Sequence, residues 1–132
     1  MAKEFNSDSL LAEAHDYYKL SVGGLKRKNI FTNEILYNTI SISIEKYIMG
    51  LFVSHKQLPQ CHTLFNMITE MKKFATVDDN LVQQMHYFDK KQQICSLATY
   101  NKKDIADEDI LNFIYVLNEV KRIVLSNVVT NS

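Results

Sequence analysis

Two stretches decide the fold of this chain: IEKYIMGLF at residues 44–52 and LPQCHTL at residues 58–64. The first carries one charged pair, Glu45 and Lys46, in an otherwise apolar run, which is typical of a helix buried on most sides. In the second stretch, Pro59 lacks an amide donor and disfavours a helical conformation in the residue before it. The pattern therefore predicts two buried helices joined by a corner at the proline.

The segment ISISI at residues 40–44 alternates as a β-strand would, and it is the one ambiguous element. Length argues against a strand, because apolar residues continue at helical spacing on both sides of the segment and no proline interrupts them. We predict one helix from Phe31 or Thr32 to about His55, and we expect it to be the central core helix.

Turn-forming residues are rare in the 132-residue chain, which has only three Gly and one Pro. This composition predicts a few long helices. We expect a single domain over residues 1–132, with a core at about 9–127, folded as an all-α, up-down bundle of four to five helices. The other helices are predicted to begin near Ser7 or Ser9, either of which can cap, at about Cys61 (ending near Phe74) and at a cap Thr76 or Asp78. The last helix is predicted to follow a polar segment at residues 99–103, with the acidic residues Asp104 and 107–109 at its start and a fraying tail from Val128. The inward positions predicted for the last helix are Ile110, Phe113, Ile114, Leu117, Val120 and Val124.

Positive and negative charges balance in this chain, with 15 Lys and Arg against 15 Asp and Glu. A dedicated nucleic-acid binder usually has a basic excess, because neutralising phosphates supplies most of its non-specific affinity. The local exceptions are four short basic clusters at residues 26–28, 72–73, 90–91 and 102–103. We interpret them first as solubilising residues near helix ends.

The cysteines and the longest apolar run predict the cellular compartment of the protein. Cys61 and Cys95 do not make a disulfide framework, so we expect both thiols to be reduced. The longest apolar run, from Ile48 to Val53, is far too short to span a bilayer. We therefore expect a soluble, cytoplasmic protein with no membrane partner.

Common catalytic and metal-binding motifs are absent from the sequence. It contains no Glu-x-x-His pair of a di-iron bundle, no HExxH or Cys-x-x-Cys zinc motif, and no glycine-rich phosphate loop. We expect no metal and no cofactor. What remains is metal-free RNA cleavage, in which one group takes the 2′-hydroxyl proton and a cation stabilises the phosphorane. Histidine and arginine commonly supply those two roles.

Three segments resemble successive parts of the HEPN domain: AHDYY at residues 14–18, the helix with Glu45 and Lys46, and PQCHTL at residues 59–64. The resemblance covers about residues 9–127. It implies a bundle of four or five helices that is often a dimer. Many members of this family are ribonucleases with an Arg-x(4–6)-His motif. Others accompany a minimal nucleotidyltransferase in toxin–antitoxin pairs.

The catalytic motif of that family is missing here. The chain has two arginines, Arg27 and Arg122, and neither is followed by a histidine after four to six residues. The nearest substitute is Lys56, with five residues between it and His62. Lysine lacks the planar fork with which arginine holds a phosphate. The departure favours a divergent member without catalytic activity.

We therefore expect a non-catalytic, HEPN-like binding module rather than an enzyme. It would be a homodimer that engages a nucleotide, RNA or a nucleotidyltransferase partner. The candidate ligand-binding residues are Glu45, Lys46, His62 and Tyr100. One alternative is a metal-independent ribonuclease of toxin type that uses His62 with Lys56, and another is a structural helical adaptor. For single residues, the competing interpretations are a solvated helix edge for Glu45 and Lys46 and a helix cap for His62.

Overall fold

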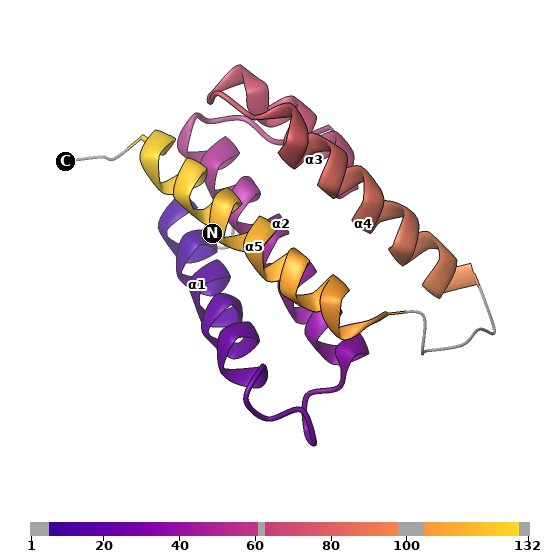
Figure 1. The fold of residues 1–132 in the computed structure, drawn as a ribbon. Helices are drawn as coiled ribbons and strands as arrows, with labels where there is room; N and C mark the ends of the chain where they lie inside the picture. Colours follow the sequence, from indigo (N-terminus) through magenta and orange to yellow (C-terminus); the bar gives the residue numbers. More distant parts are fainter. Residues whose placement is uncertain (1–5, 61–62, 98–104, 130–132) are drawn as a thin grey trace.

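The computed structural model describes residues 6–60, 63–97 and 105–129. Its elements, in chain order, are α1 (Ser7–Gly24), α2 (Asn33–Ser54), α3 (Leu64–Glu70), a short 3-10 helix η2 (Met71–Lys73), α4 (Asp79–Leu97) and α5 (Asp107–Asn127) (Figure 1). These ranges contain helices and turns but no strand, so the predicted all-α bundle is confirmed.

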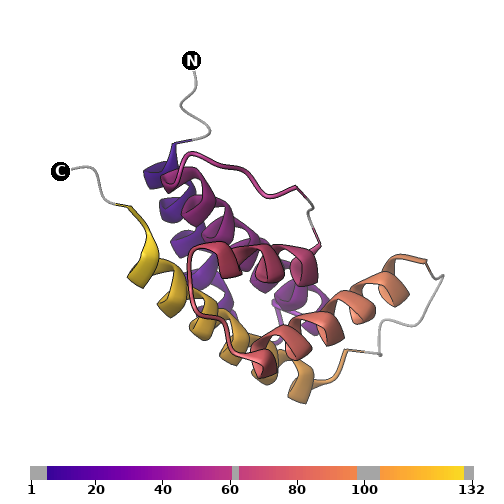
Figure 2. The same ribbon diagram turned by 90° about the horizontal axis from the view of Figure 1, so that it is seen from above.

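The helix α2 lies at the centre of the bundle, in contact with α1, α3 and α5. Figures 1 and 2 show that α5 lies between α1 and α4 on one side of the molecule. None of the described helices is both long and apolar enough to cross a membrane.

The ambiguous segment at residues 40–44 belongs to α2 and is helical, as its length predicted. Thr32 caps the helix by accepting a hydrogen bond from the amide of Ile35 at 3.3 Å. Ile40 and Ile44 are completely buried. Between them, the hydroxyl of Ser43 donates to the carbonyl of Ala14 at 2.8 Å, so the polar side chain inside this apolar helix is satisfied by α1.

The helix α1 begins at Ser7, as predicted, but neither Ser7 nor Ser9 is its cap. Asn6 is the N-cap, because its side-chain oxygen accepts from the amides of Asp8 (2.7 Å) and Ser9 (3.3 Å). Ser7 serves another purpose, since its hydroxyl donates to the carbonyl of Gly50 on α2 at 2.9 Å. The predicted caps Ser7 and Ser9 are therefore wrong, although the predicted helix is present.

The helix α3 is shorter than the predicted span from Cys61 to Phe74. Its N-cap is Thr63, whose hydroxyl accepts from the amide of Asn66, so the prediction of His62 as the cap is wrong. The carboxylate of Asp89 on α4 adds a second cap by accepting from the amides of Leu64 (3.0 Å) and Phe65 (2.5 Å). Two neighbouring elements are thus tied together through the start of α3.

Aromatic rings join the other helices to the core. The ring of Phe113 on α5 lies 4.1 Å from that of Phe88 on α4 and 4.8 Å from that of Tyr37 on α2, between ring centroids. Asp78 caps α4 by accepting from the amide of Asn80 at 2.8 Å, as one of the two predicted candidates. Five of the six predicted inward positions of α5 are buried and Ile114 is half-buried; Val116 and Ile123 are buried as well.

The end of α5 is held against the end of α2. His55 donates from Nε2 to the carbonyl of Asn127 at 3.0 Å, and the amide of Val129 donates to the hydroxyl of Ser54 at 3.0 Å. Val128 packs against the core. The helix ends at Asn127, just before the predicted tail, and the side chains of Ser54 and His55 bind the backbone of Val129 and Asn127. Fraying from Val128 stays a prediction.

Candidate functional site

The residues predicted to bind a ligand are not gathered into one site among the described residues. Glu45 and Lys46 are half-buried in the middle of α2, where Lys46 Nζ lies 2.7 Å from Glu13 Oε1. Lys56 is exposed beyond the end of the same helix, with a left-handed φ of 61°. Ten helical residues span about 15 Å, so Lys56 lies far from Lys46. His62 and Tyr100 fall outside the described residues.

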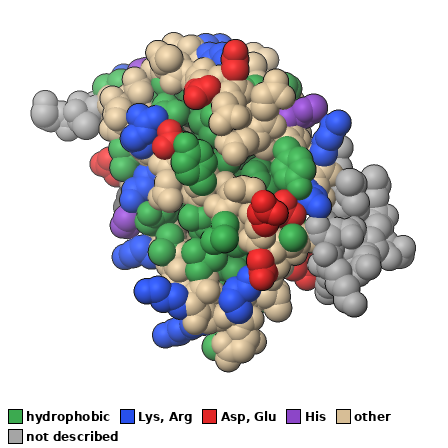
Figure 3. Space-filling view, in the orientation of Figure 1, with side chains coloured by type: hydrophobic (Ala, Val, Ile, Leu, Met, Phe, Trp, Pro, Cys, Tyr) green, Lys and Arg blue, Asp and Glu red, His purple; other side chains and the backbone are tan. Residues whose placement is uncertain are grey.

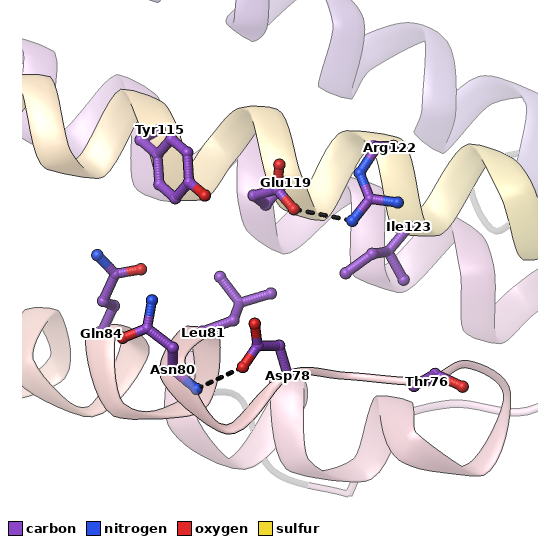
Figure 4. A pocket seen from close by; sticks show the side chains of 9 residues that line it. All are labelled: Thr76, Asp78, Asn80, Leu81, Gln84, Tyr115, Glu119, Arg122 and Ile123. Carbon is purple, nitrogen blue, oxygen red and sulfur yellow. Dashed lines mark hydrogen bonds and ion pairs between the residues drawn. The ribbon is translucent and has the colours of Figure 1, made fainter.

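A polar cavity lies between α4 and α5 (Figure 4). Its volume is about 320 Å³, and it is lined by Thr76, Asp78, Asn80, Leu81, Gln84, Tyr115, Glu119, Arg122 and Ile123. The guanidinium of Arg122 donates to Glu119 Oε1 at 2.8 Å, and this hydrogen bond raises the pKa of Arg122. Because the lining contains the carboxylates of Asp78 and Glu119 and only one guanidinium, the cavity is unfavourable for a phosphate.

One acceptor in this cavity has no partner among the described residues. The Oε1 atom of Gln84 is buried there without a hydrogen bond. Buried polar atoms in native proteins almost always have a partner, so the atom is available to a donor that enters the cavity. The cavity can therefore receive a neutral or cationic donor-bearing group.

A second cavity of about 390 Å³ continues along the same two helices and shares Gln84. At its rim the hydroxyl of Tyr87 donates to Asp109 Oδ1 at 2.8 Å. Partial burial, together with this hydrogen bond, raises the pKa of Tyr87 to about 12. Lys91 Nζ lies 3.6 Å from the other oxygen of Asp109. The carboxylate is thus shared by these two side chains and the amide of Ala106, which donates at 3.2 Å, and no Lys or Arg lines this cavity to bind a phosphate.

Cations without acidic partners gather at the turn between α1 and α2. A cavity of about 320 Å³, which we name the basic cup, is lined there by Lys19, Leu20, Gly23, Gly24, Lys26, Arg27 and Phe31. Lys19, Lys26 and Arg27 are exposed, and none of them pairs with a carboxylate among the described residues. Figure 3 shows Lys and Arg side chains gathered at the lower left, where α1 ends.

The backbone of the turn fixes the shape of the basic cup. Successive hydrogen bonds tie Lys26 N to Gly23 O (3.2 Å), Arg27 N to Gly24 O (3.0 Å) and Phe31 N to Arg27 O (2.8 Å). A Cβ at Gly24 would lie 2.8 Å from Phe31 Cγ, so only glycine lets this ring lie against the helix end. At Gly23 an added Cβ would meet nothing within 4 Å, so the basic cup is open to solvent at this residue.

Lys28, the third cation of the same cluster, has a structural role instead. Its ammonium binds the side chains of Asn33 and Asp107, the latter at 3.1 Å. Asn33 also donates to Asp107 Oδ1 at 2.8 Å. The hydrogen bond from Asn33, with the contribution of Lys28, lowers the pKa of Asp107. The cluster at residues 26–28 therefore divides into two unpaired cations and one that ties the turn to the start of α5.

The basic cup has the chemistry of a nucleic-acid contact. Exposed cations bind phosphate oxygens, and an aromatic ring such as Phe31 offers a face on which a base can stack. No group of three or more His, Cys, Asp or Glu side chains that could hold a metal ion occurs in the described part of the chain.

Comparison with known proteins supports the fold. No family model matches the chain, and no curated protein matches it. Among solved structures, the chain is similar to the crystal structure of TT1696 from Thermus thermophilus, with a TM-score of 0.74 and 12% sequence identity. The match covers 91% of this chain and 96% of that one. At this identity the likeness shows a shared helical fold and carries no information about function.

The sequence holds one signal for the basic cup that our predicted site did not use. That signal is the run of cations at residues 26–28, which we interpreted as solubilising residues; Lys19 lies on α1 and Lys26 in the turn beyond its end, so the turn brings them together. The approach of Phe31 depends on the path of the turn and has no such signal. The cavity between α4 and α5 is equally hidden, because Gln84 in the sequence resembles any polar residue of a solvated helix face.

Proposed function

We propose that this protein is a non-catalytic binding module that engages single-stranded RNA or a nucleotide through the basic cup. The observation that carries the proposal is the set of three exposed cations, Lys19, Lys26 and Arg27, around a cavity with the ring of Phe31 in its wall. Phosphates would contact the cations and a base would stack on the ring. The basic cup replaces the region of Glu45, Lys46 and His62 as the proposed site.

Charge supports this location over the others. The chain as a whole has no net charge, so its affinity for a polyanion has to come from a local excess of cations. Lys46 is neutralised by Glu13, and the α4–α5 cavity holds more carboxylates than cations. The resemblance of the sequence to HEPN domains points to the same class of ligand. A nucleotidyltransferase partner and cleavage by His62 with Lys56 stay predictions from the sequence, which no contact among the described residues favours.

Fluorescence anisotropy with a short labelled oligouridine tests the proposal. The variant Lys26→Glu/Arg27→Glu is expected to bind at least about tenfold more weakly, a loss of about 1.4 kcal/mol. The matched control is Lys72→Glu/Lys73→Glu, which changes the net charge by the same amount at two exposed lysines of η2. The control is expected to bind within about threefold of the parent protein.

Two results would overturn the proposal. One is an equal loss of affinity in both charge-reversal variants, which would mean that net charge alone governs binding. The other is the absence of binding by the parent protein to both oligouridine and mononucleotides. A further variant, Phe31→Leu, separates stacking from charge, and a loss of about 1 kcal/mol is expected if a base lies on the ring. Intact RNA on a denaturing gel after prolonged incubation is the expected outcome for a binding module.

A further inference from the structure

The α4–α5 cavity has no part in the proposed function, and it contains a buried acceptor that calls for a donor. Gln84 Oε1 has no hydrogen-bond partner among the described residues. A buried acceptor is costly to leave unpaired, so a donor that reaches it is favoured. In Figure 4 the side chains of Gln84 and Asp78 extend from α4 toward α5, and the ring of Tyr115 extends from α5 toward α4. A ligand in the cavity can therefore contact groups from both helices.

The charge of the lining favours a cation as that donor. Glu119 is neutralised by Arg122, whose guanidinium donates to Glu119 Oε1 at 2.8 Å. Asp78 accepts a hydrogen bond from the amide of Asn80, but no Lys or Arg pairs with its carboxylate among the described residues. One negative charge of the lining is therefore not neutralised. A cation that enters the cavity interacts favourably with Asp78 and also supplies the donor that Gln84 Oε1 lacks.

The rest of the lining suits an ammonium group on an alkyl chain. Leu81 and Ile123 are apolar and can contact methylene groups. The ring of Tyr115, which is 54% exposed, offers a face to a cation. A metal ion is less suitable, because no group of three or more His, Cys, Asp or Glu side chains that could hold one occurs in the part of the chain that the structure describes. An alkylammonium group donates up to three hydrogen bonds and needs no such cage.

The second cavity extends the same site along α5. Gln84 lines both cavities, so a ligand that binds its Oε1 has both within reach. Glu108 lines the second cavity, is exposed, and pairs with no Lys or Arg among the residues that the structure describes. It lies eleven residues before Glu119, or about 16 Å along the helix. A ligand that satisfies Asp78, Gln84 and Glu108 together has to be extended and to carry positive charge at both ends.

We propose that the two cavities form one binding site for an aliphatic polyamine of the spermidine type. One terminal ammonium lies at Asp78, against the ring of Tyr115. The secondary amine donates to Gln84 Oε1, and the other terminal ammonium lies at Glu108. Alkylamines of this kind are protonated at neutral pH, as the lysine side chain is. The site is independent of the basic cup, with which it shares no residue.

Isothermal titration of spermidine into the protein at physiological ionic strength tests the site. The protein is first freed of nucleic acid, because RNA itself binds polyamines. Saturable binding of one spermidine per chain is expected. Gln84→Leu should bind it at least about tenfold more weakly, because the variant lacks a hydrogen bond to a charged group. Loss of the fold does not explain such a result, since leucine in place of the unpaired acceptor should stabilise the protein. Unchanged affinity in Gln84→Leu, or no saturable binding by the parent protein, would overturn the proposal.

The carboxylate at one end of the site is tested by two matched variants. Asp78→Asn removes a charge from the cavity but keeps a side chain that can cap α4. Asp79→Asn removes the same charge from the next residue, which is exposed and lines neither cavity. The first variant should bind spermidine about threefold more weakly, and the second should bind it as the parent does. An equal loss in both would overturn the proposal, because net charge alone would then govern the affinity.

Shorter and more compact cations test the shape of the site. Putrescine, a diamine with a shorter chain, should bind at least about threefold more weakly than spermidine, and Glu108→Gln should lower the affinity for spermidine toward that of putrescine. Mg²⁺ at the same concentration should not displace spermidine. Equal affinities for the two amines, or displacement by Mg²⁺, would overturn the proposal. Binding of oligouridine to the basic cup is expected to be unchanged in Gln84→Leu and Asp78→Asn, so failure of either proposal leaves the other testable.

Discussion

The α1–α2 hairpin and the α4–α5 pair are joined in opposite ways. Between α1 and α2, small residues bring the helices into close contact: a Cβ at Gly50 would lie 2.6 Å from Leu11 Cδ2, and Ser43 binds the backbone of Ala14. Between α4 and α5, the rings of Phe88 and Phe113 stack, and two cavities of about 320 and 390 Å³, lined mainly by polar residues, lie along the same two helices.

The two regions differ in how far their surfaces are closed within one chain. A tightly packed hairpin holds its turn in one shape, which suits a basic cup that must present three cations at fixed positions. The α4–α5 pair leaves Gln84 Oε1 without a partner among the described residues, and α5 has an apolar stripe facing outward. The first region is complete within one chain. The second has an open cavity and exposed apolar side chains on α5.

The largest change in the free energy of unfolding is expected where α1 and α2 touch. Gly50→Val should lower the free energy of unfolding by about 3 kcal/mol, because its side chain would overlap Leu11 and force the helices apart. Gly23→Ala is the control, since an added Cβ there meets nothing within 4 Å. That variant should gain about 0.5–1 kcal/mol from helix propensity. Urea unfolding measures both, and a Gly50→Val variant as stable as the parent would show that close approach does not hold this hairpin together.

The buried Tyr47 of the hairpin should make stability fall at high pH. Burial, with a smaller contribution from Tyr18, raises the pKa of Tyr47 to about 12, against 10.0 for an ordinary tyrosine. The unfolded chain therefore loses this proton first. The resulting stability is fully present below pH 10 and is lost as pH rises from 10 to about 12, by about 3 kcal/mol at most.

Unfolding measured at several pH values should show a flatter profile for Tyr47→Phe than for the parent protein. Tyr87 on the α4–α5 side has a pKa raised to a similar value but is 47% exposed. Because solvent screens an exposed group, Tyr87→Phe should flatten the profile less. Equal flattening by both variants would contradict the contrast between a closed and an open region.

A smaller change in the free energy of unfolding, an increase this time, is expected for a substitution in the α4–α5 cavity. Gln84→Leu replaces a buried acceptor that has no partner among the described residues and should raise the free energy of unfolding by about 1 kcal/mol. Gln83→Leu is the control at the neighbouring exposed position, where a change of less than about 0.5 kcal/mol is expected. A clear loss of stability in Gln84→Leu would mean that this side chain is already satisfied in the free protein.

The smallest effect is expected for the ion pair between Glu13 and Lys46. A double-mutant cycle with Glu13→Ala and Lys46→Ala should give a coupling energy below about 0.5 kcal/mol, because both groups are partly exposed to water. Lys46→Ala should also leave oligouridine binding unchanged. A marked loss of binding would return the site to the middle of α2, where the sequence alone had placed it.

The sequence predicted most of the fold because its signals are local. The apolar spacing and length of α2 outweighed the strand-like alternation at residues 40–44, and the acidic cluster at residues 107–109, which the sequence assigned with Asp104 to a helix start, lies in the first turn of α5. Caps were less predictable. Asn6 and Ser7 can both cap a helix, and the contact of Ser7 with Gly50 on α2 decides between them. Long-range caps have no local signal at all, as Asp89 shows by closing α3 from α4.

The candidate sites were harder to predict, because each one depends on the path of the chain. Lys26 and Arg27 are visible as a basic cluster, yet only the turn shows that Lys28 is paired with Asp107 while the other two are not. The burial of Gln84 depends on how α4 faces α5. Residues chosen by resemblance alone, such as Glu45 and Lys46, lie elsewhere on the molecule.

The salt dependence of RNA binding tests most directly whether the hairpin turn is a phosphate-binding site. Three cations that each neutralise one phosphate of a single strand should give a slope of about −2 in log K against log salt concentration. For Lys26→Glu/Arg27→Glu the slope should fall close to zero, while Lys72→Glu/Lys73→Glu should keep the parent value. A parent slope near zero, or an unchanged slope in the first variant, would contradict the assignment of the basic cup.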